Sequence, residues 1–208
     1  MIAAALSLSV QVAIVATILV TIAGTLTGRA LARRAFRGRE VVDTLLTLPL
    51  VLPPTVTGYA LLVLLGRSGL GLPIPFTWVA CVVAAAVMSF PLMHRAARVA
   101  FEELDPRHTL TAASLGATRL RSFFAVELPL ARRGLAAGIA LSFARGLGEF
   151  GATLLLAGNI PGRTQTLPLA VYEASLTGDD RAALLLCLLL TGVSIAVLLL
   201  VARIGRSR

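Results

Sequence analysis

The sequence contains no lysine, few acidic residues and few aromatic residues, and these shortages limit the class of protein. Only 14% of its 208 residues are charged, whereas 57% are hydrophobic. Soluble domains carry far more charge, so the composition predicts a membrane protein in which almost the whole chain is membrane domain. The net charge of +9 comes from arginine alone. In a soluble protein it would suggest nucleic acid as a partner, so the placement of the arginines must decide that question.

Cysteine and histidine are also scarce. Cys81 and Cys187 each lie inside an apolar stretch, with no second cysteine or histidine at metal-ligand spacing. This excludes a disulfide framework and predicts no metal site. His94 and His108 fall in or beside the one long polar segment, and we expect both to be solvated surface residues.

No phosphate-binding loop of the pattern GxxxxGK[ST] occurs in the chain, so it cannot hydrolyse ATP by that chemistry. The ionisable residues deep in apolar sequence are Arg145 and Glu149, which do not form a nucleophile–base or metal constellation. The sequence therefore predicts a protein that is not an enzyme, with no catalytic residues and no bound cofactor.

Apolar segments long enough to cross a bilayer, which takes about 20 residues, alternate with arginine-rich connections. We expect spans at 3–27, 44–65, 76–93, 135–156 and 182–201, with a polar loop at 94–133. The prediction is an all-α polytopic membrane protein of about five transmembrane helices, forming one domain over residues 1–208. Pro49, Pro53 and Pro54 each remove a backbone donor, so the second span should be kinked or partly unwound, which leaves six spans as the alternative count.

The arginines are distributed unevenly between the connections. Fifteen fall in the three segments that follow the first, third and fifth spans, and three fall in the segments on the other side: Arg67, Arg163 and Arg181. This positive-inside bias predicts an external N-terminus and a cytoplasmic C-terminus, and it removes the argument for nucleic acid. The external segment 158–181 should include a short interfacial helix at 167–176, either as a docking surface for an external partner or as a passive connector.

Residues 111–129, TAASLGATRLRSFFAVELP, are the signature segment of the cytoplasmic loop. Before it, Asp105 followed by Pro106 predicts a helix start, and Gly116 predicts a left-handed helix end. Leu120, Phe123 and Phe124 then share one apolar face. An amphipathic hairpin resting on the membrane surface is the alternative to a partner-binding loop.

Polar residues inside two of the spans suggest a transport path. Thr55, Thr57 and Tyr59 follow the proline break, where their hydroxyls either line a polar route or satisfy carbonyls of their own helix. Arg145 and Glu149 are spaced i, i+4 near the centre of the fourth span, where they form a structural ion pair or line an anion route. In the same span the pairs Gly134/Gly138 and Gly148/Ala152 predict close helix contacts.

The signature segment resembles the cytoplasmic loop of ABC importer permeases, whose pattern is Glu-Ala-Ala, three residues, Gly, nine residues, Ile, one residue, Leu-Pro. Thr111 stands in place of Glu and Val126 in place of Ile. Three further stretches, 48–59, 143–153 and 158–174, look like the permease subunit of molybdate importers. Sulfate and thiosulfate permeases share a similar Arg-x-x-Gly-Glu segment, so those anions are the alternative cargo.

The resemblance implies a type I ABC importer permease fold in the bacterial cytoplasmic (inner) membrane, surrounded by lipid. It implies a homodimer, two cytoplasmic ATP-binding subunits that carry the ATP and magnesium, and an external molybdate-binding protein. The residues expected to contact the ATP-binding subunit are Ala112, Ala113, Leu115, Gly116, Leu120, Phe123 and Phe124. The residues expected on the translocation path are Thr55, Thr57, Arg145 and Glu149. An ion-coupled secondary transporter is a further alternative, although the chain has no evident internal repeat.

Overall fold

The computed structural model describes residues 2–33 and 36–206, and the side chains of residues 200–202 and 204–206 are not described. Within these ranges every regular element is helical and there is no strand, which confirms the all-α prediction. Of the arginines used above to orient the chain, Arg34 and Arg208 lie outside the described residues, as does the side chain of Arg206.

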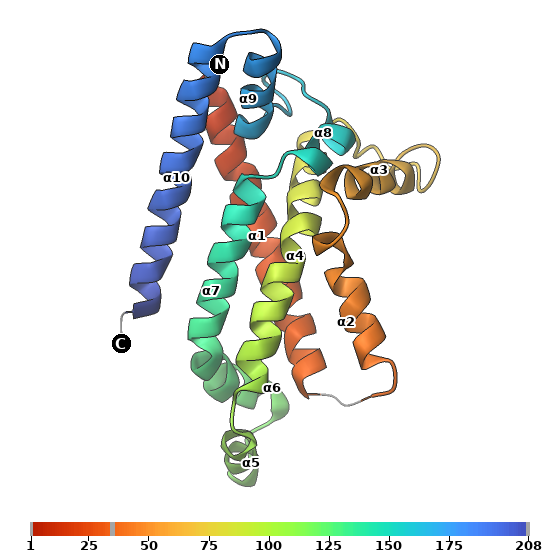
Figure 1. Ribbon diagram of the computed structural model, residues 1–208. Helices are drawn as coiled ribbons and strands as arrows, with labels where there is room; N and C mark the ends of the chain where they lie inside the picture. The colour runs from red at the N-terminus through yellow and green to blue at the C-terminus, as the bar shows by residue number, and fades with distance from the viewer. Residues whose placement is uncertain (1, 34–35, 207–208) are drawn as a thin grey trace.

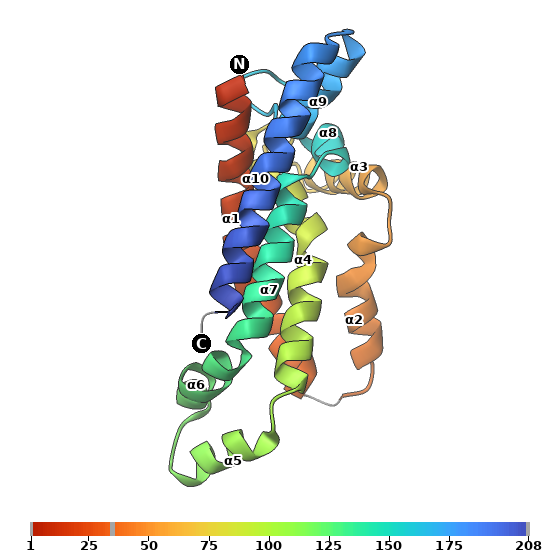
Figure 2. The same ribbon diagram turned by 60° about the vertical axis from the view of Figure 1, so that its left-hand side comes forward.

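Four long helices form the body of the molecule: α1 (Ile2–Arg33), α4 (Trp78–Glu102), α7 (Leu128–Leu147) and α10 (Asp180–Arg206). In Figures 1 and 2, α1, α4 and α7 run side by side, while α10 lies along α7 and reaches α9. The core of the bundle is built largely from small side chains, which allow the helices to approach closely. Those that are completely buried include Ala13, Ala16, Ala80, Ala84 and Ala85.

Glycine supplies the closest contacts between these helices. A Cβ added at Gly134 would lie 2.6 Å from the Cβ of Ala100, and one at Gly138 would lie 2.7 Å from the Cβ of Ala96. Both neighbours belong to α4, so the predicted close contact of the Gly134/Gly138 pair is confirmed. The companion pair is only half realised, because Ala152 is packed tightly against Gly58 whereas Gly148 meets only the carbonyl of Ala144 in its own helix.

The second apolar segment is broken, as its prolines predict. Helix α2 (Arg39–Thr47) continues into the short 3-10 turn η1 (Leu48–Leu50). After three non-helical residues, α3 (Pro54–Leu65) runs in a different direction. The two halves are bent by 106°. Pro53 and Pro54 cause the break because neither can donate a backbone hydrogen bond to the preceding turn. In Figure 1, α3 therefore extends sideways from the bundle.

The fourth apolar segment is broken as well, and here the prediction of one continuous helix over 135–156 is wrong. Helix α7 ends at Leu147 and α8 (Gly151–Ala157) begins after a bend of 58°. Glu149 consequently lies in the connection between two helices instead of on the face of one. The helices α1, α4 and α10 are each long and apolar enough to cross a membrane, and each bent pair could supply one more crossing, to a total of up to five.

The signature segment folds into α5 (Pro106–Ser114), α6 (Arg119–Ser122) and the π-helical turn η2 (Phe123–Glu127). Asp105 caps α5 by accepting a hydrogen bond from the Arg107 N–H at 2.8 Å, and Gly116 has a φ of +78°. Both features confirm the predicted start and end of this helix. Figures 1 and 2 show α5 and α6 projecting from one end of the bundle, which we call the loop end. The helix predicted at 167–176 is α9 (Leu167–Leu176), at the opposite end.

Candidate functional site

The two breaks meet in space. A Cβ added at Gly151, the first residue of α8, would lie 2.9 Å from the Cβ of Pro54, the first residue of α3. One turn further on, a Cβ at Gly58 would lie 2.7 Å from the Cα of Ala152. The starts of the two short helices are therefore packed backbone to backbone. Irregular backbone at membrane depth is tolerated where it is covered by protein or lines a wet cavity, so this junction is the candidate site.

Arg145 and Glu149 lie at the junction, and they form an ion pair, one of the two arrangements that their spacing left open. Arg145 Nη1 is 2.6 Å from Glu149 Oε2, and Glu149 Oε1 accepts a hydrogen bond from the Ala152 N–H at 2.8 Å. Glu149 thus caps the start of α8 while it balances the arginine. The Glu149 side chain is 1% exposed, whereas that of Arg145 is 27% exposed. The guanidinium therefore retains an open side from which it can donate hydrogen bonds to an anion.

The two threonines of the predicted path differ in their surroundings. Thr55 is exposed, whereas Thr57 is buried and its Oγ1 has no hydrogen-bond partner within the part of the chain that is described. Thr57 therefore does not satisfy a carbonyl freed by the break, which was the structural alternative. Its hydroxyl remains an unused donor on α3, the helix that follows the break in the second apolar segment.

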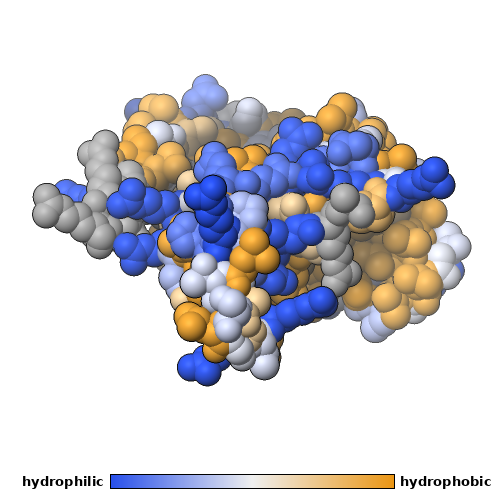
Figure 3. All heavy atoms as spheres, turned by 90° about the horizontal axis from the view of Figure 1, so that it is seen from below, coloured by the Kyte–Doolittle hydropathy of each residue, from blue (hydrophilic) through white to orange (hydrophobic). Residues whose placement is uncertain are grey.

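The signature segment exposes only part of the predicted contact set. The exposed members are Ala113, Leu115, Gly116, Leu120 and Phe124. Leu115, Leu120 and Phe124 are 82%, 69% and 57% exposed, which is far more than apolar side chains of a packed hairpin would be. In Figure 3 apolar side chains reach the surface at the loop end among many hydrophilic ones.

Ala112 and Phe123 are buried in the chain by itself, so only the other five members of the predicted set present themselves at the surface. The ring of Phe123 packs inward against Phe101 of α4, with centroids 6.3 Å apart. The shared apolar face of Leu120, Phe123 and Phe124 assumed an α-helix. Residues 123–127 form a π-helical turn instead, and of the two adjacent rings Phe123 is buried against the bundle whereas Phe124 is exposed.

His94 is the residue that sequence reasoning placed wrongly. It is completely buried near the loop end, where its Nε2 lies 2.9 Å from Asp43 Oδ1 of α2 and its Nδ1 lies 2.9 Å from Thr27 Oγ1 of α1. Arg98 Nη1 approaches the same Asp43 oxygen at 2.7 Å. The signal was available in the i, i+4 spacing of His94 and Arg98, which places both on one face of α4.

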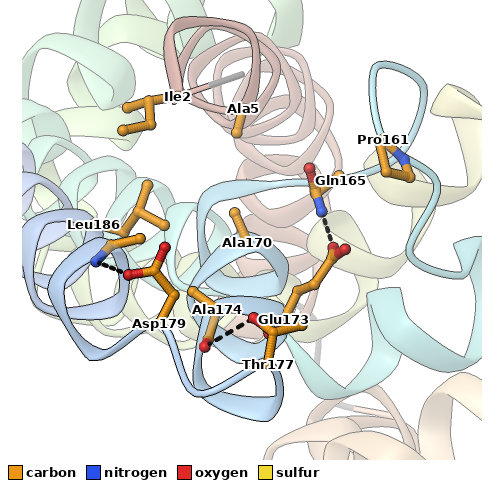
Figure 4. A pocket seen from close by; sticks show the side chains of 11 residues that line it. Ile2, Ala5, Pro161, Gln165, Ala170, Glu173, Ala174, Thr177, Asp179 and Leu186 are labelled. Atoms are coloured by element: carbon orange, nitrogen blue, oxygen red, sulfur yellow. Dashed lines mark hydrogen bonds between the residues drawn. The ribbon is translucent and has the colours of Figure 1, made fainter.

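At the opposite end, a pocket lies between α1, α9, α10 and the 158–166 connection (Figure 4). Its charged lining residues are Glu173 and Asp179. The Glu173 carboxylate accepts hydrogen bonds from the amides of Gln165 and Asn159, and Asp179 caps α10 through the Ala182 N–H. Two carboxylates disfavour an oxyanion here. Among the described residues no cluster of three metal-ligating side chains occurs.

Comparison with known proteins agrees with this architecture. The chain is 46% identical over 191 residues to the molybdenum transport system permease protein ModB of Escherichia coli, covering 86% of this chain and 83% of that protein. It is 36% identical over 203 residues to the sulfate transport system permease protein CysT of Salmonella typhimurium, covering 94% and 73%.

A chain of the MetNI methionine ABC transporter, solved in inward-facing conformations, superimposes with a TM-score of 0.79 at 18% identity, covering 98% of this chain and 95% of that one. This likeness confirms the fold of an ABC importer permease. Residues 20–207 match the family described as binding-protein-dependent transport system inner membrane component. The chain is therefore a member of that family of membrane permeases.

Proposed function

We propose that this chain is the membrane-spanning permease subunit of an ATP-driven importer that carries molybdate, and the chemically similar tungstate, across the bacterial cytoplasmic membrane. The observation that carries the proposal is the partly exposed guanidinium of Arg145 at the junction of two broken spans. The 46% identity to a molybdenum permease over most of both chains supports the choice of anion.

The junction suits transient binding of an oxyanion. Arginine forms strong, directional hydrogen bonds to oxyanions, but a lone arginine at membrane depth is costly. Glu149 lowers this cost while the path is empty, and a passing anion can take its place as the ion-pair partner of Arg145. The unused Thr57 hydroxyl is a second donor, and Thr55 lies exposed at the start of the same helix.

The energy for transport comes from a partner, because the chain lacks a phosphate-binding loop. We infer that two ATP-binding subunits, which carry the ATP and magnesium, grip the exposed part of the signature segment in a homodimer of this chain. Leu115, Leu120 and Phe124 supply an apolar contact, and the neighbouring arginines supply a polar rim. An external molybdate-binding protein would deliver the anion at the end where α8 and α9 lie.

The arginine distribution supports an external N-terminus and a cytoplasmic loop end, with lipid around the body of the bundle. Figure 3 looks at the loop end and shows hydrophilic side chains crowded on it.

The test is uptake of radiolabelled molybdate into proteoliposomes that hold this chain with its co-purified ATP-binding subunits and its binding protein. We expect uptake to require ATP on the side of the membrane where the ATP-binding subunits lie. Tungstate should compete with molybdate more strongly than sulfate does. Stronger competition by sulfate would assign the chain to the sulfate permeases, for which the CysT relative provides the specific precedent. Uptake driven by an ion gradient without ATP would contradict the proposal.

A further inference from the structure

A buried carboxylate joins the signature segment to helix α1. Glu127 is the last residue of η2 and is 4% exposed. It accepts two hydrogen bonds from Arg29, one from Nε to Oε2 at 2.7 Å and one from Nη2 to Oε1 at 2.9 Å. Such a two-pronged pair fixes the direction as well as the distance between its partners. Arg33 Nε lies 3.9 Å from the same carboxylate, so the negative charge faces two arginines of α1.

Phe123, the first residue of η2, also contacts Arg29. The guanidinium of Arg29 lies over the ring of Phe123, 4.8 Å from its centroid. The first and last residues of η2 therefore both contact Arg29, one through the face of a ring and one through a carboxylate. We call Arg29, Phe123 and Glu127 the η2 clamp.

Helix α1 is packed closely against α4 beside the clamp. A Cβ at Gly28 would lie 2.7 Å from the backbone nitrogen of Arg98 and 2.8 Å from the Cβ of Ala97, so α1 and α4 are in backbone contact one residue away from Arg29. Thr27 contacts His94 of α4, and His94 contacts Asp43 of α2, each at 2.9 Å. A continuous set of contacts thus leads from η2 through α1 and α4 to α2. Helix α2 continues through η1 to the break before α3.

We propose that the η2 clamp is the positioning element that transmits a displacement of α5 and α6 to helix α1, and through it to the broken span. This inference rests on the proposed function, since it assumes that a partner moves the signature segment. The backbone carries any such motion into α7 directly because η2 and α7 are continuous. The clamp adds α1, which has no backbone connection to the loop at this point. Single π-helical turns inside α-helices are frequent at functional sites, which fits this role.

The test separates transmission from folding. Glu127→Gln keeps the size of the side chain and removes its charge, and Arg29→Lys keeps the charge and removes the two-pronged geometry. The control is Arg132→Gln, which removes the charge of an exposed arginine near the start of α7 without changing any residue of the clamp or of the contacts between α1, α4 and α2. The readout is molybdate taken up per ATP hydrolysed in proteoliposomes, measured only on complexes that assemble with the ATP-binding subunits.

We expect both clamp variants to hydrolyse ATP while the uptake ratio falls by at least about fivefold, the lower end of coupling between sites in proteins. The control should keep its ratio within about twofold, because substitutions at exposed positions usually have small effects. The double exchange R29E/E127R, which restores opposite charges, should recover part of the ratio. An unchanged ratio of molybdate uptake to ATP hydrolysis in assembled Glu127→Gln complexes would overturn the proposed role of the clamp. It would leave the proposed function unaffected. ATP hydrolysis without molybdate uptake in the wild-type complex would instead overturn the proposed function.

Discussion

Gly58 holds the candidate site together, and replacing it with alanine tests how closely the two broken spans must approach. The added Cβ would meet the Cα of Ala152 at 2.7 Å, its carbonyl oxygen at 2.8 Å and its carbonyl carbon at 3.1 Å. All three atoms belong to backbone, so no side-chain rotation relieves the conflict. Carbon atoms in contact normally lie about 3.5–4.0 Å apart, and α3 must therefore move away from α8 by about 1 Å.

The expected cost follows from two opposing effects. Overpacking of a rigid contact costs about 1–3 kcal/mol, and the backbone neighbours at Gly58 place it near the upper end. Alanine gains about 0.5–1 kcal/mol over glycine within a helix because glycine loses more backbone entropy on folding. Gly58→Ala should therefore destabilise the protein by about 2 kcal/mol, which lowers the melting temperature by about 4–8 °C for a chain of this size.

Thermal unfolding of the detergent-solubilised protein measures this change, and Gly146→Ala is the matched control. The nearest atom to a Cβ at Gly146 is the Cβ of Ala85 at 3.9 Å, an ordinary contact, so the control should melt at the wild-type temperature or above. Molybdate uptake should fall in Gly58→Ala and not in Gly146→Ala. If both variants were equally stable and equally active, the junction of α3 and α8 would not be as tight as described, and the reasoning about the site would fail.

Three further predictions address the other residues of the site and the loop. Arg145→Ala should abolish molybdate uptake with normal amounts of folded protein in the membrane, and equal loss of folded protein would show that its pair with Glu149 is only structural. Leu120→Ala combined with Phe124→Ala should prevent co-purification of the ATP-binding subunits without lowering the melting temperature, because both side chains are exposed; retained co-purification would place the partner contact elsewhere. His94→Ala should destabilise the chain by about 3 kcal/mol, since it removes a buried ring and leaves the Asp43 carboxylate short of a partner; a melting temperature like that of wild type would refute this.

The features that the sequence predicted correctly are governed by local interactions. The cap at Asp105 and the left-handed Gly116 depend on a few neighbouring residues, and the break at Pro53 and Pro54 depends on missing donors. Alternation of apolar and arginine-rich segments was sufficient for the fold class. The ion pair of Arg145 and Glu149 was one of the two arrangements that their spacing of four residues left open.

The features that were missed depend on contacts between distant parts of the chain. His94 was expected at the surface, but its partner Asp43 is 51 residues away, and only the packing of α2 against α4 buries the ring. Arg29 and Glu127 are separated by 98 residues. The break before Gly151 was missed for a different reason. It contains no proline, and glycine in an apolar run is compatible with an unbroken membrane helix as well as with a bend.

The π-helical turn at Phe123–Glu127 has a consequence for the length of the segment around it. Such a turn accommodates one residue more than an α-helical turn, and each residue of an α-helix corresponds to a rotation of about 100° around the axis. Removing Ala125 would let the turn close as an ordinary α-helix and swing Leu120 about a quarter of the way round from its present direction. The number of residues between Gly116 and Val126, nine, is therefore constrained by the turn. Substitutions that leave this number unchanged should be tolerated more readily than the deletion of a single residue.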